Sequence, residues 1–304
     1  SKGKTMKDLY ASDALGADNS DVSAQFGGPG MRHSIRPRRT VIDHEDEFDG
    51  DLASEETLPT AAPAVSRYIG DDLAPRWQDL PIATPGPGGD MPLVDDHRNS
   101  AAARAFDLLR TRLRQTTLEH RWVNIAVTAP TSGCGNSFSA TNLALSLSRV
   151  PGSRTVLMDM NMRSPGLARA FDMQAPGAMS DLLSGQADLG KGMLRVSDTL
   201  ALGLNDQPEV NAAEILQDSA TAETLLRLRA SLQPEIVLYD MPPMLEHDDL
   251  SAFLPQLDGV LLISDGTQTM ARHLRECERM LEGQVPLLGI VLNRARASSL
   301  PKYA

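Results

Sequence analysis

One short stretch of this sequence carries residues whose types and spacing suit phosphate chemistry. It reads Thr131-Ser132-Gly133-Cys134-Gly135-Asn136-Ser137, and it follows an apolar strand-like segment and leads into a helix-like one. Glycines that join a strand to a helix leave several backbone N–H groups directed at one point, where the helix dipole also favours an anion. The stretch therefore predicts a loop that cradles phosphate, with the Ser137 hydroxyl as a ligand for Mg²⁺.

Asn136 stands where this loop pattern ordinarily has a lysine. The lysine ammonium reaches the outer phosphates and neutralises their charge during phosphoryl transfer. Asparagine has a similar size and no charge. Loss of one well-aimed electrostatic group from a reacting site costs roughly 10²–10³ in rate, or about 3–4 kcal/mol. We predict a loop that keeps its geometry for phosphate and transfers a phosphoryl group slowly or not at all.

Two further strand-like segments end in carboxylates. Asp159 ends the segment 155–159, and Asp240 ends the segment 236–240 and precedes Met241-Pro242-Pro243. The carboxyl ends of parallel strands meet at one edge of a sheet, where ligands of such folds bind. We therefore expect three strand ends to converge on the phosphate loop.

The elements that must position these residues alternate between apolar strands and helices. Strands are predicted at 123–128, 155–159, 199–204, 236–240, 260–264 and 288–293, and helices at 101–118, 137–149, 212–216, 222–232, 250–254 and 270–281. This alternation predicts the α/β class, with a doubly wound, mostly parallel sheet covered on both faces.

The charge of the chain is unevenly distributed and suggests two regions. Residues 1–97 hold 9 Lys or Arg and 18 Asp or Glu, a net charge of 9 − 18 = −9, whereas residues 98–304 hold 20 against 22, a net charge of −2. The first region is also rich in Pro and Gly and has no sustained hydrophobic period. We predict that residues 1–97 form a disordered acidic tail and linker, and that residues 98–304 fold.

The composition limits the other possibilities. The two cysteines, Cys134 and Cys277, have neither a disulfide framework nor metal-site spacing, which favours a reducing cytoplasm. Cys134 is either a thiol with a pKa lowered by the helix N-terminus or a small loop residue. The apolar runs are strand-sized, so attachment to the inner face of the cell membrane is expected only through a partner. The net charge of −11 argues against nucleic-acid binding.

With these motifs in place, residues 102–297 resemble the bacterial tyrosine autokinases of capsule and exopolysaccharide export, a branch of the deviant Walker-type P-loop ATPases. Further support comes from the segments 106–113, 163–165, 176–177, 181–185 and 211–216. The resemblance implies that residues 98–304 form a kinase-like nucleotide-binding domain with ATP or ADP and Mg²⁺ as cofactors. The residues expected at the nucleotide are Gly133, Cys134, Gly135, Asn136, Ser137, Phe138, Arg163 and Asn293.

The same resemblance implies particular roles. Asp159 and Asp240 would organise magnesium and activate the attacking hydroxyl, with Ser137 as the third metal ligand. Asn293 would contact the base, and Arg163 is interpreted as a partial substitute for the missing lysine. Such a chain is expected to work with an integral-membrane polysaccharide co-polymerase or chain-length regulator, and a competent kinase paralogue or a further copy of the chain are additional candidate partners.

The sequence departs from the family pattern beyond the loop. Asn161 replaces a second aspartate, and Tyr303 is the only tyrosine after Asn293, where the family has a cluster of phosphoacceptors. The family packs into rings through a Glu, an Arg and an Arg at three-residue spacing. Here these positions are Arg104, Asp107 and Arg110, which form either a solvated charged face or a specialised contact with another protein.

Three functions remain open on this basis. The first is a catalytically impaired regulatory or scaffolding subunit of polysaccharide export. The second is an active tyrosine autokinase with a compensating cation and Tyr303 as its phosphoacceptor. The third is a positioning ATPase of the partition or septum-site type. The third is disfavoured because Thr131 stands near the place of their extra lysine and no basic amphipathic helix closes the chain.

Overall fold

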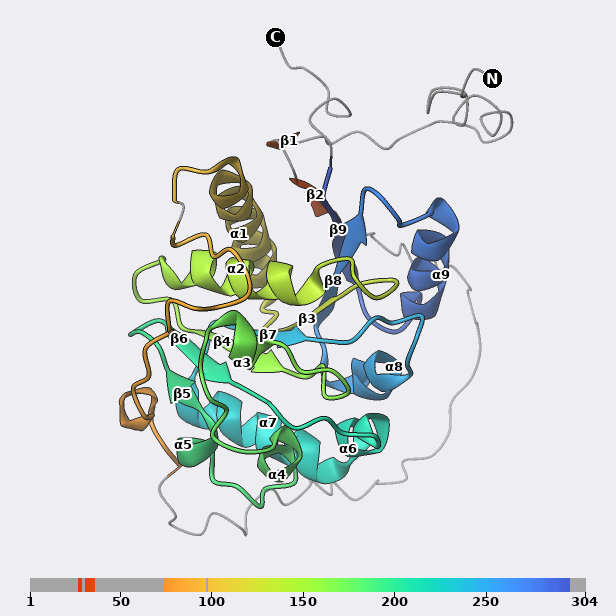
Figure 1. Ribbon diagram of the computed structural model, residues 1–304. Helices are drawn as coiled ribbons and strands as arrows, with labels where there is room; N and C mark the ends of the chain where they lie inside the picture. The colour runs from red at the N-terminus through yellow and green to blue at the C-terminus, as the bar shows by residue number, and fades with distance from the viewer. Residues whose placement is uncertain (1–26, 29–30, 36–73, 97, 296–304) are drawn as a thin grey trace, which may run out of the picture.

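The fold is built on one large sheet (Figure 1). The computed structural model describes residues 27–28, 31–35, 74–96 and 98–295. The strand order is β1-β2-β9-β8-β3-β7-β4-β6-β5. The strands are β1 (Gly27–Gly28), β2 (Met31–Ile35), β3 (Asn124–Thr128), β4 (Thr155–Asp159), β5 (Leu194–Arg195), β6 (Leu200–Gly203), β7 (Ile236–Asp240), β8 (Gly259–Asp265) and β9 (Leu287–Asn293).

The central strands from β9 to β6 are all parallel, whereas β1, β2 and β5 add antiparallel edges. Every residue of β3, β4, β7 and β8 is buried. Continuous apolar runs suit strands that are covered on both faces, which is the usual condition of a parallel sheet. The predicted fold class is confirmed.

Helices cover both faces of the sheet. Along β3, Ile125 and Val127 pack with one helical layer and Ala126 with the other, because successive side chains of a strand point to opposite faces. The first layer contains α1 (Ala101–His120), α2 (Asn136–Ser148) and α3 (Leu167–Ala170). The second contains α4 (Met179–Leu183), α5 (Leu189–Gly192), α6 (Ala212–Gln217), α7 (Ser219–Leu232), α8 (Asp249–Phe253) and α9 (Ala271–Leu281).

Capping residues set the ends of the longer helices. The Ser100 hydroxyl accepts a hydrogen bond from the N–H of Ala103 at the start of α1. Asp218 caps α7 in the same way through Ala220, so this helix begins three residues before its predicted start at residue 222. The short helices α3, α4 and α5, of four or five residues each, were not predicted.

The packed part of the chain begins before residue 98. Trp77, Leu80 and Val94 are buried, and Ile82 forms a parallel bridge to Arg195. A 3-10 helix, η1 (Trp77–Asp79), lies in this segment, and a second one, η2 (Leu254–Gln256), follows α8. The packed region therefore extends to the N-terminal side of the predicted boundary at residue 98. The sequence did not reveal this, because the few apolar residues of this Pro- and Gly-rich segment show neither helical nor strand periodicity. Most of the predicted tail lies outside the described residues.

Within the described ranges, no helix has both the length and the apolar character that crossing a bilayer requires.

Candidate functional site

The predicted phosphate loop lies between β3 and α2, at the carboxyl edge of the sheet. Gly133 and Gly135 both have positive φ angles, of 80° and 89°, which side chains rarely tolerate. A Cβ atom on Gly135 would also collide with the side-chain amide of Asn293. Glycine at these positions therefore permits both the turn of the loop and its close approach to the end of β9.

Three successive carbonyl groups of the loop are held from one side. The Gln268 side chain donates to Ser132 O at 3.0 Å, Arg294 Nη1 donates to Gly133 O at 2.8 Å, and Asn293 Nδ2 donates to Cys134 O at 3.0 Å. In the described part of the chain, the N–H groups from 133 to 137 donate to no other protein group. The loop thus presents an anion-binding cradle of free backbone donors.

The other side of the loop is tied to the segment that follows β7. Both the N–H and the hydroxyl of Ser132 donate to the carboxylate of Glu246, the former at 2.7 Å. The N–H groups of Met244 and Leu245 donate to the carbonyl oxygens of Ala129 and Pro130. The loop is therefore fixed on both sides without any contribution from a lysine.

The Asn136 side chain binds the end of β7. Its Nδ2 donates to Asp240 Oδ1 at 3.1 Å and to Met241 O at 2.8 Å, and the residue is only 8% exposed. An amide that spans the end of β7 in this way satisfies two buried acceptors, whereas it supplies no positive charge.

Asp159 and Asp240 lie opposite each other at the ends of neighbouring strands, and both are fully buried. Asp159 Oδ2 accepts hydrogen bonds from the N–H groups of Gly166 at 3.0 Å and Leu167 at 2.9 Å. Burial raises the pKa of Asp159 to about 7 despite these bonds. Burial and the neighbouring Asp159 charge also raise the pKa of Asp240, against hydrogen bonds from Ser137 and Asn136. The pair consequently resists full ionisation near neutral pH.

These residues suit a magnesium ion. Asp159 Oδ1 and Asp240 Oδ2 are buried and have no hydrogen-bond partner among the described groups. Buried polar atoms without partners are rare in proteins, and carboxylate, hydroxyl and phosphate oxygens are the ligands that Mg²⁺ prefers. Ser137, Asp159 and Asp240 are thus the residues that would hold the ion. The described residues contain no cluster of three or more His, Cys, Asp or Glu that is arranged to hold a metal.

Arg163 is engaged elsewhere. Its Nε and Nη2 donate to the buried carboxylate of Asp249 at 2.9–3.1 Å, and its Nη1 donates to Val210 O at 2.9 Å. The interpretation of Arg163 as a substitute for the loop lysine is therefore not supported by its contacts. Arg163 instead lines an open cavity of about 540 Å³, together with Met244, Leu245, Glu246, His247, Asp248, Ser251, Glu276 and Met280.

Asn293 makes its contacts within the chain. Its Nδ2 binds the loop carbonyl of Cys134, and its Oδ1 accepts a hydrogen bond from the N–H of Arg294 at 2.9 Å. With both polar atoms occupied and 8% of the residue exposed, Asn293 braces the loop. Arg294 was missed from the sequence, although its place directly after the last predicted strand was a usable signal.

Cys134 and Phe138 are packing residues in this structure. The Cys134 side chain is fully buried, with Sγ 3.5 Å from Thr269 Oγ1. This burial favours the interpretation of Cys134 as a small loop residue. The Phe138 ring packs edge-on against Phe106 of α1, with 5.9 Å between the ring centres. Tyr303, the predicted phosphoacceptor, lies outside the described residues.

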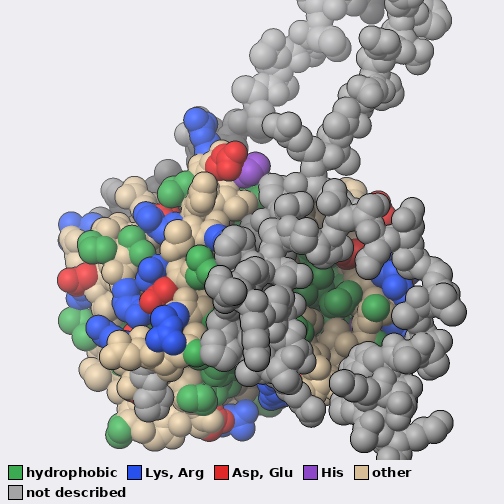
Figure 2. Space-filling model, turned by 90° about the horizontal axis from the view of Figure 1, so that it is seen from above, with side chains coloured by type: hydrophobic (Ala, Val, Ile, Leu, Met, Phe, Trp, Pro, Cys, Tyr) green, Lys and Arg blue, Asp and Glu red, His purple; other side chains and the backbone are tan. Residues whose placement is uncertain are grey.

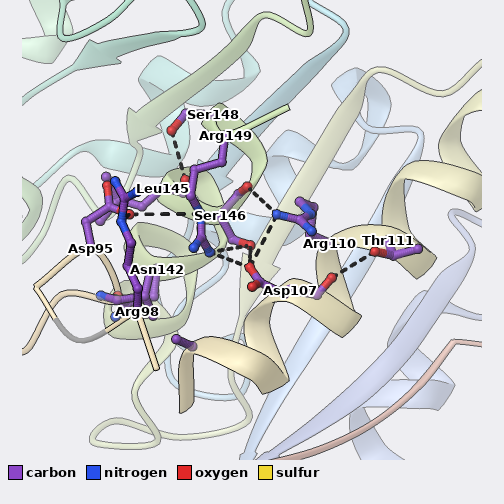
Figure 3. Close-up of polar contacts among 12 residues, drawn as sticks. Asp95, Arg98, Asp107, Arg110, Thr111, Asn142, Leu145, Ser146, Ser148 and Arg149 are labelled. Carbon is purple, nitrogen blue, oxygen red and sulfur yellow. Dashed lines mark hydrogen bonds and ion pairs between the residues drawn. The ribbon is translucent and has the colours of Figure 1, made fainter. Parts of the chain in front are cut away.

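Arg104, Asp107 and Arg110, three of the charged residues of α1, make contacts within the chain. Figure 3 shows Asp107 between Arg110, Ser146 and Arg149. Arg110 also donates to Ser146 O at 3.1 Å. Arg104, one turn earlier, is exposed and donates to the Asn99 carbonyl at 2.7 Å. On the visible part of the face in Figure 2, basic side chains lie beside acidic and apolar ones, so no patch of a single sign dominates there.

Comparison with known proteins relates this chain to bacterial tyrosine kinases. No family model matches the chain. EpsB of Ralstonia nicotianae is 30% identical over 191 residues, which are 61% of this chain and 24% of that protein. The succinoglycan biosynthesis transport protein ExoP of Rhizobium meliloti is 28% identical, with coverages of 61% and 24%. The tyrosine-protein kinase YwqD of Bacillus subtilis is 23% identical, with coverages of 67% and 86%.

The chain spans about a quarter of the length of the first relatives it matches. Among solved structures, it is similar to the kinase domain of the Escherichia coli tyrosine kinase ETK. That domain has a TM-score of 0.62 and 21% identity, and the match covers 69% of this chain and 82% of the domain. The two chains share a fold.

Proposed function

Because the homologues of this chain are bacterial tyrosine kinases and related proteins of capsule and exopolysaccharide biosynthesis, we propose that it is a kinase-like nucleotide-binding protein of polysaccharide export that transfers phosphoryl groups slowly or not at all. Its role in this proposal is that of a regulatory or scaffolding subunit. ATP or ADP with Mg²⁺ is its ligand.

One observation carries the loss of activity. Asn136 occupies the position of the loop lysine, and its uncharged amide is bound to Asp240 and Met241. Arg163 does not replace the lysine charge in this proposal, because its guanidinium is paired with Asp249. Phosphoryl transfer depends on positive charge near the outer phosphates, because negative charge builds up there as the bond breaks. Without that charge, the site binds its ligand and turns it over poorly.

Nucleotide binding itself is supported by the loop. The N–H groups from 133 to 137 have no protein acceptor among the described residues, and both walls of the loop are hydrogen-bonded to neighbouring segments. A preformed site loses little conformational freedom when its ligand binds. Bound Mg²⁺ would neutralise part of the phosphate charge. Ser137, Asp159 and Asp240 would hold it, and its binding would compete with the proton that the two carboxyl groups retain.

The proposed partner is an integral-membrane polysaccharide co-polymerase or chain-length regulator, and the relative ExoP is named for succinoglycan biosynthesis and transport. A chain that binds nucleotide without using it could report nucleotide occupancy to such a partner. A competent kinase paralogue or a further copy of this chain is a second possible partner.

The test combines calorimetry with turnover. Wild-type protein is titrated with ADP and ATP, with and without Mg²⁺, and ATP consumption and phosphotyrosine are measured in parallel. We expect binding with little turnover. Asn136→Lys should raise turnover about tenfold or more, because it returns one electrostatic group to the reacting site. Asn136→Gln, which keeps an uncharged amide, is the matched control and should not raise it.

Some outcomes would contradict the proposal. Wild-type turnover equal to that of Asn136→Lys would show that the site does not need the lysine. Phosphotyrosine that forms in the wild type and disappears in Asp159→Ala would favour the active autokinase. Nucleotide-dependent co-sedimentation with liposomes or DNA would favour a positioning ATPase. Absence of any nucleotide binding would leave a scaffold and overturn the proposed site.

A further inference from the structure

The open cavity of about 540 Å³ beside Arg163 adjoins the phosphate loop and takes no part in the function proposed above. We propose that this cavity is a docking site for a Lys- or Arg-rich peptide segment with apolar side chains, supplied by the cytoplasmic part of the membrane partner, and that Glu246 couples its occupancy to the phosphate loop. The inference rests on the proposed function, which supplies both the partner and the nucleotide.

The cavity lies where three elements meet. Its walls are the segment 244–248 after β7, the first turn of α8, and one face of α9, where Glu276 and Met280 are one turn apart. Met244 is buried, and Leu245 and Met280 pack partly buried against the second helical layer. Methionine side chains are flexible and adapt to different apolar surfaces. The apolar part of the lining therefore suits a partner side chain that is not fixed in shape.

The charged part of the lining is mainly acidic. Among the described residues that line the cavity, the carboxylates are those of Glu246, Asp248 and Glu276, and the guanidinium is that of Arg163. The Asp248 side chain is 78% exposed, and its carboxylate lies 3.7 Å from Arg163 Nη2. Charges of one sign in a concave site attract a ligand of the opposite sign.

Neighbouring ion pairs do not cancel this acidity. Arg163 is matched by the buried carboxylate of Asp249, and Glu276 is matched by Arg279 of the same helix. With these two partners included, the described groups hold two positive and four negative charges, a net charge of 2 − 4 = −2. The cavity thus retains negative charge that a cationic ligand would neutralise.

Lysine and arginine side chains match both parts of the lining. Each places methylene groups on apolar surface and keeps its charged end among carboxylates and water. Segments on the cytoplasmic side of membrane-spanning helices carry an excess of Lys and Arg. An integral-membrane partner therefore presents the chemistry that this cavity is complementary to.

Glu246 belongs to the cavity and to the loop. Its carboxylate accepts hydrogen bonds from the N–H of Ser132 at 2.7 Å and from the Ser132 hydroxyl. A carboxylate has about four acceptor sites, so a Lys or Arg can pair with Glu246 while both bonds persist. Such a pair neutralises a negative charge beside the anion-binding loop, and phosphate binding becomes more favourable. Nucleotide and docked segment should therefore strengthen each other's binding by the same factor.

The first experiment tests the docking site without nucleotide. Two synthetic peptides of equal length, one alternating Lys with Leu and one alternating Glu with Leu, are titrated calorimetrically into the full chain. We expect the Lys peptide to bind, more weakly as salt is added, and the Glu peptide not to bind. Asp248→Asn and Glu276→Gln should each weaken binding of the Lys peptide about two- to fivefold.

The variants leave the fold in place. Asp248 precedes α8 without a side-chain capping bond, so its replacement by asparagine removes only charge. Glu278→Gln is the matched control, because Glu278 is exposed on α9 and is not part of the cavity lining. It should change binding of the Lys peptide by less than about 1.5-fold.

The second experiment tests the coupling. ADP is titrated into the wild type with and without the Lys peptide, and we expect the peptide to tighten ADP binding about two- to fivefold. In Glu246→Gln, whose amide oxygen still accepts a hydrogen bond from Ser132, the peptide should leave ADP binding unchanged.

Several results would overturn the proposal. Equal weakening in Glu278→Gln would assign peptide binding to the general acidity of the chain, and binding of both peptides would assign it to apolar adhesion. Unchanged or weaker ADP binding in the presence of the Lys peptide would overturn the coupling. Absence of ADP binding without any peptide would overturn the proposed nucleotide site, whereas absence of Lys-peptide binding would overturn the docking site alone.

Discussion

At the scale of single residues, the two buried carboxyl groups at the strand ends have unsatisfied hydrogen-bonding capacity. Asp159 and Asp240 each keep one oxygen without a hydrogen-bond partner among the described residues. In a site with a loop lysine, the ammonium would compensate part of their charge. Here the neighbour is the neutral Asn136 amide. Ionisation of this pair in the folded protein is therefore unfavourable, and the free energy of unfolding should depend on pH as a result.

We predict that the protein loses stability as the pH rises from about 4 to about 7. The pKa of Asp159 is about 7 in the folded state, whereas the ordinary value of 3.8 applies to the unfolded chain. Between these two pKa values the folded state binds more protons than the unfolded chain. The stability that protonated Asp159 contributes is therefore fully present below the unfolded-state pKa, and it is lost as the pH rises through the folded-state pKa. At about 1.4 kcal/mol per pKa unit, the change amounts to a few kcal/mol.

Asp159→Asn provides the comparison, because an amide of the same size cannot ionise. Urea unfolding of both proteins at several pH values between about 4.5 and about 7.5 should show a shallower decline for the variant. Parallel pH profiles would mean that Asp159 ionises in the folded protein as easily as in the unfolded one.

At the scale of elements, the pairing of α1 with α2 decides what the charged residues of α1 do. Asp107 accepts hydrogen bonds from Ser146 at 2.6 Å and from Arg149, both near the end of α2, and from Arg110 at 3.3 Å (Figure 3). Hydrogen bonds to a charged acceptor contribute more than neutral ones. The half-buried Asp107 is thus a link between two helices of the same chain.

We predict that Asp107→Ala lowers the free energy of unfolding by about 1–3 kcal/mol, since it leaves two arginines and a serine without their common acceptor. Arg104→Ala, one turn away on the exposed side, should change it by less than about 0.5 kcal/mol. Denaturant unfolding measures both. Light scattering after size-exclusion chromatography completes the test. A change of assembly size with unchanged stability in Asp107→Ala would restore the alternative of an intermolecular contact.

At the scale of the whole molecule, the segment 74–96 joins parts of the domain that are distant in sequence. Trp77 packs into the second helical layer, and the Arg154 guanidinium lies 5.4 Å from the centre of its ring. Val94 belongs to the first layer, and its N–H donates to Asn142 Oδ1 of α2 at 2.7 Å. The segment therefore crosses from one layer to the other along the edge of the sheet.

We predict that Trp77→Ala destabilises the protein by about 3–5 kcal/mol, the usual cost of removing a large buried aromatic side chain. Ile82→Ala is the control, because Ile82 lies in the same segment and is 73% exposed. It should cost less than about 1 kcal/mol. Equal denaturation midpoints for Trp77→Ala and the wild type would show that residues 74–96 do not contribute to the folded domain.

Much of the sheet could be predicted from the sequence, and the predicted strands 155–159 and 236–240 agree with β4 and β7 to the residue. Buried parallel strands are continuous apolar runs, so their signal lies within a few adjacent residues. The edge strands β1 and β5 lacked such a signal, because each has only two residues. The phosphate loop could be predicted for the same reason, since its glycines are adjacent in sequence to the other residues of the motif.

What the sequence determined by itself was local: a phosphate loop without lysine, carboxylates at two strand ends, and an alternation of strands and helices. Only the tertiary structure decided how these residues use their polar atoms. Asn136 meets Asp240 across 104 positions of the chain, and Arg294 meets Gly133 across 161. No local period or spacing encodes such contacts. They arise because strands far apart in sequence end side by side at one edge of the sheet.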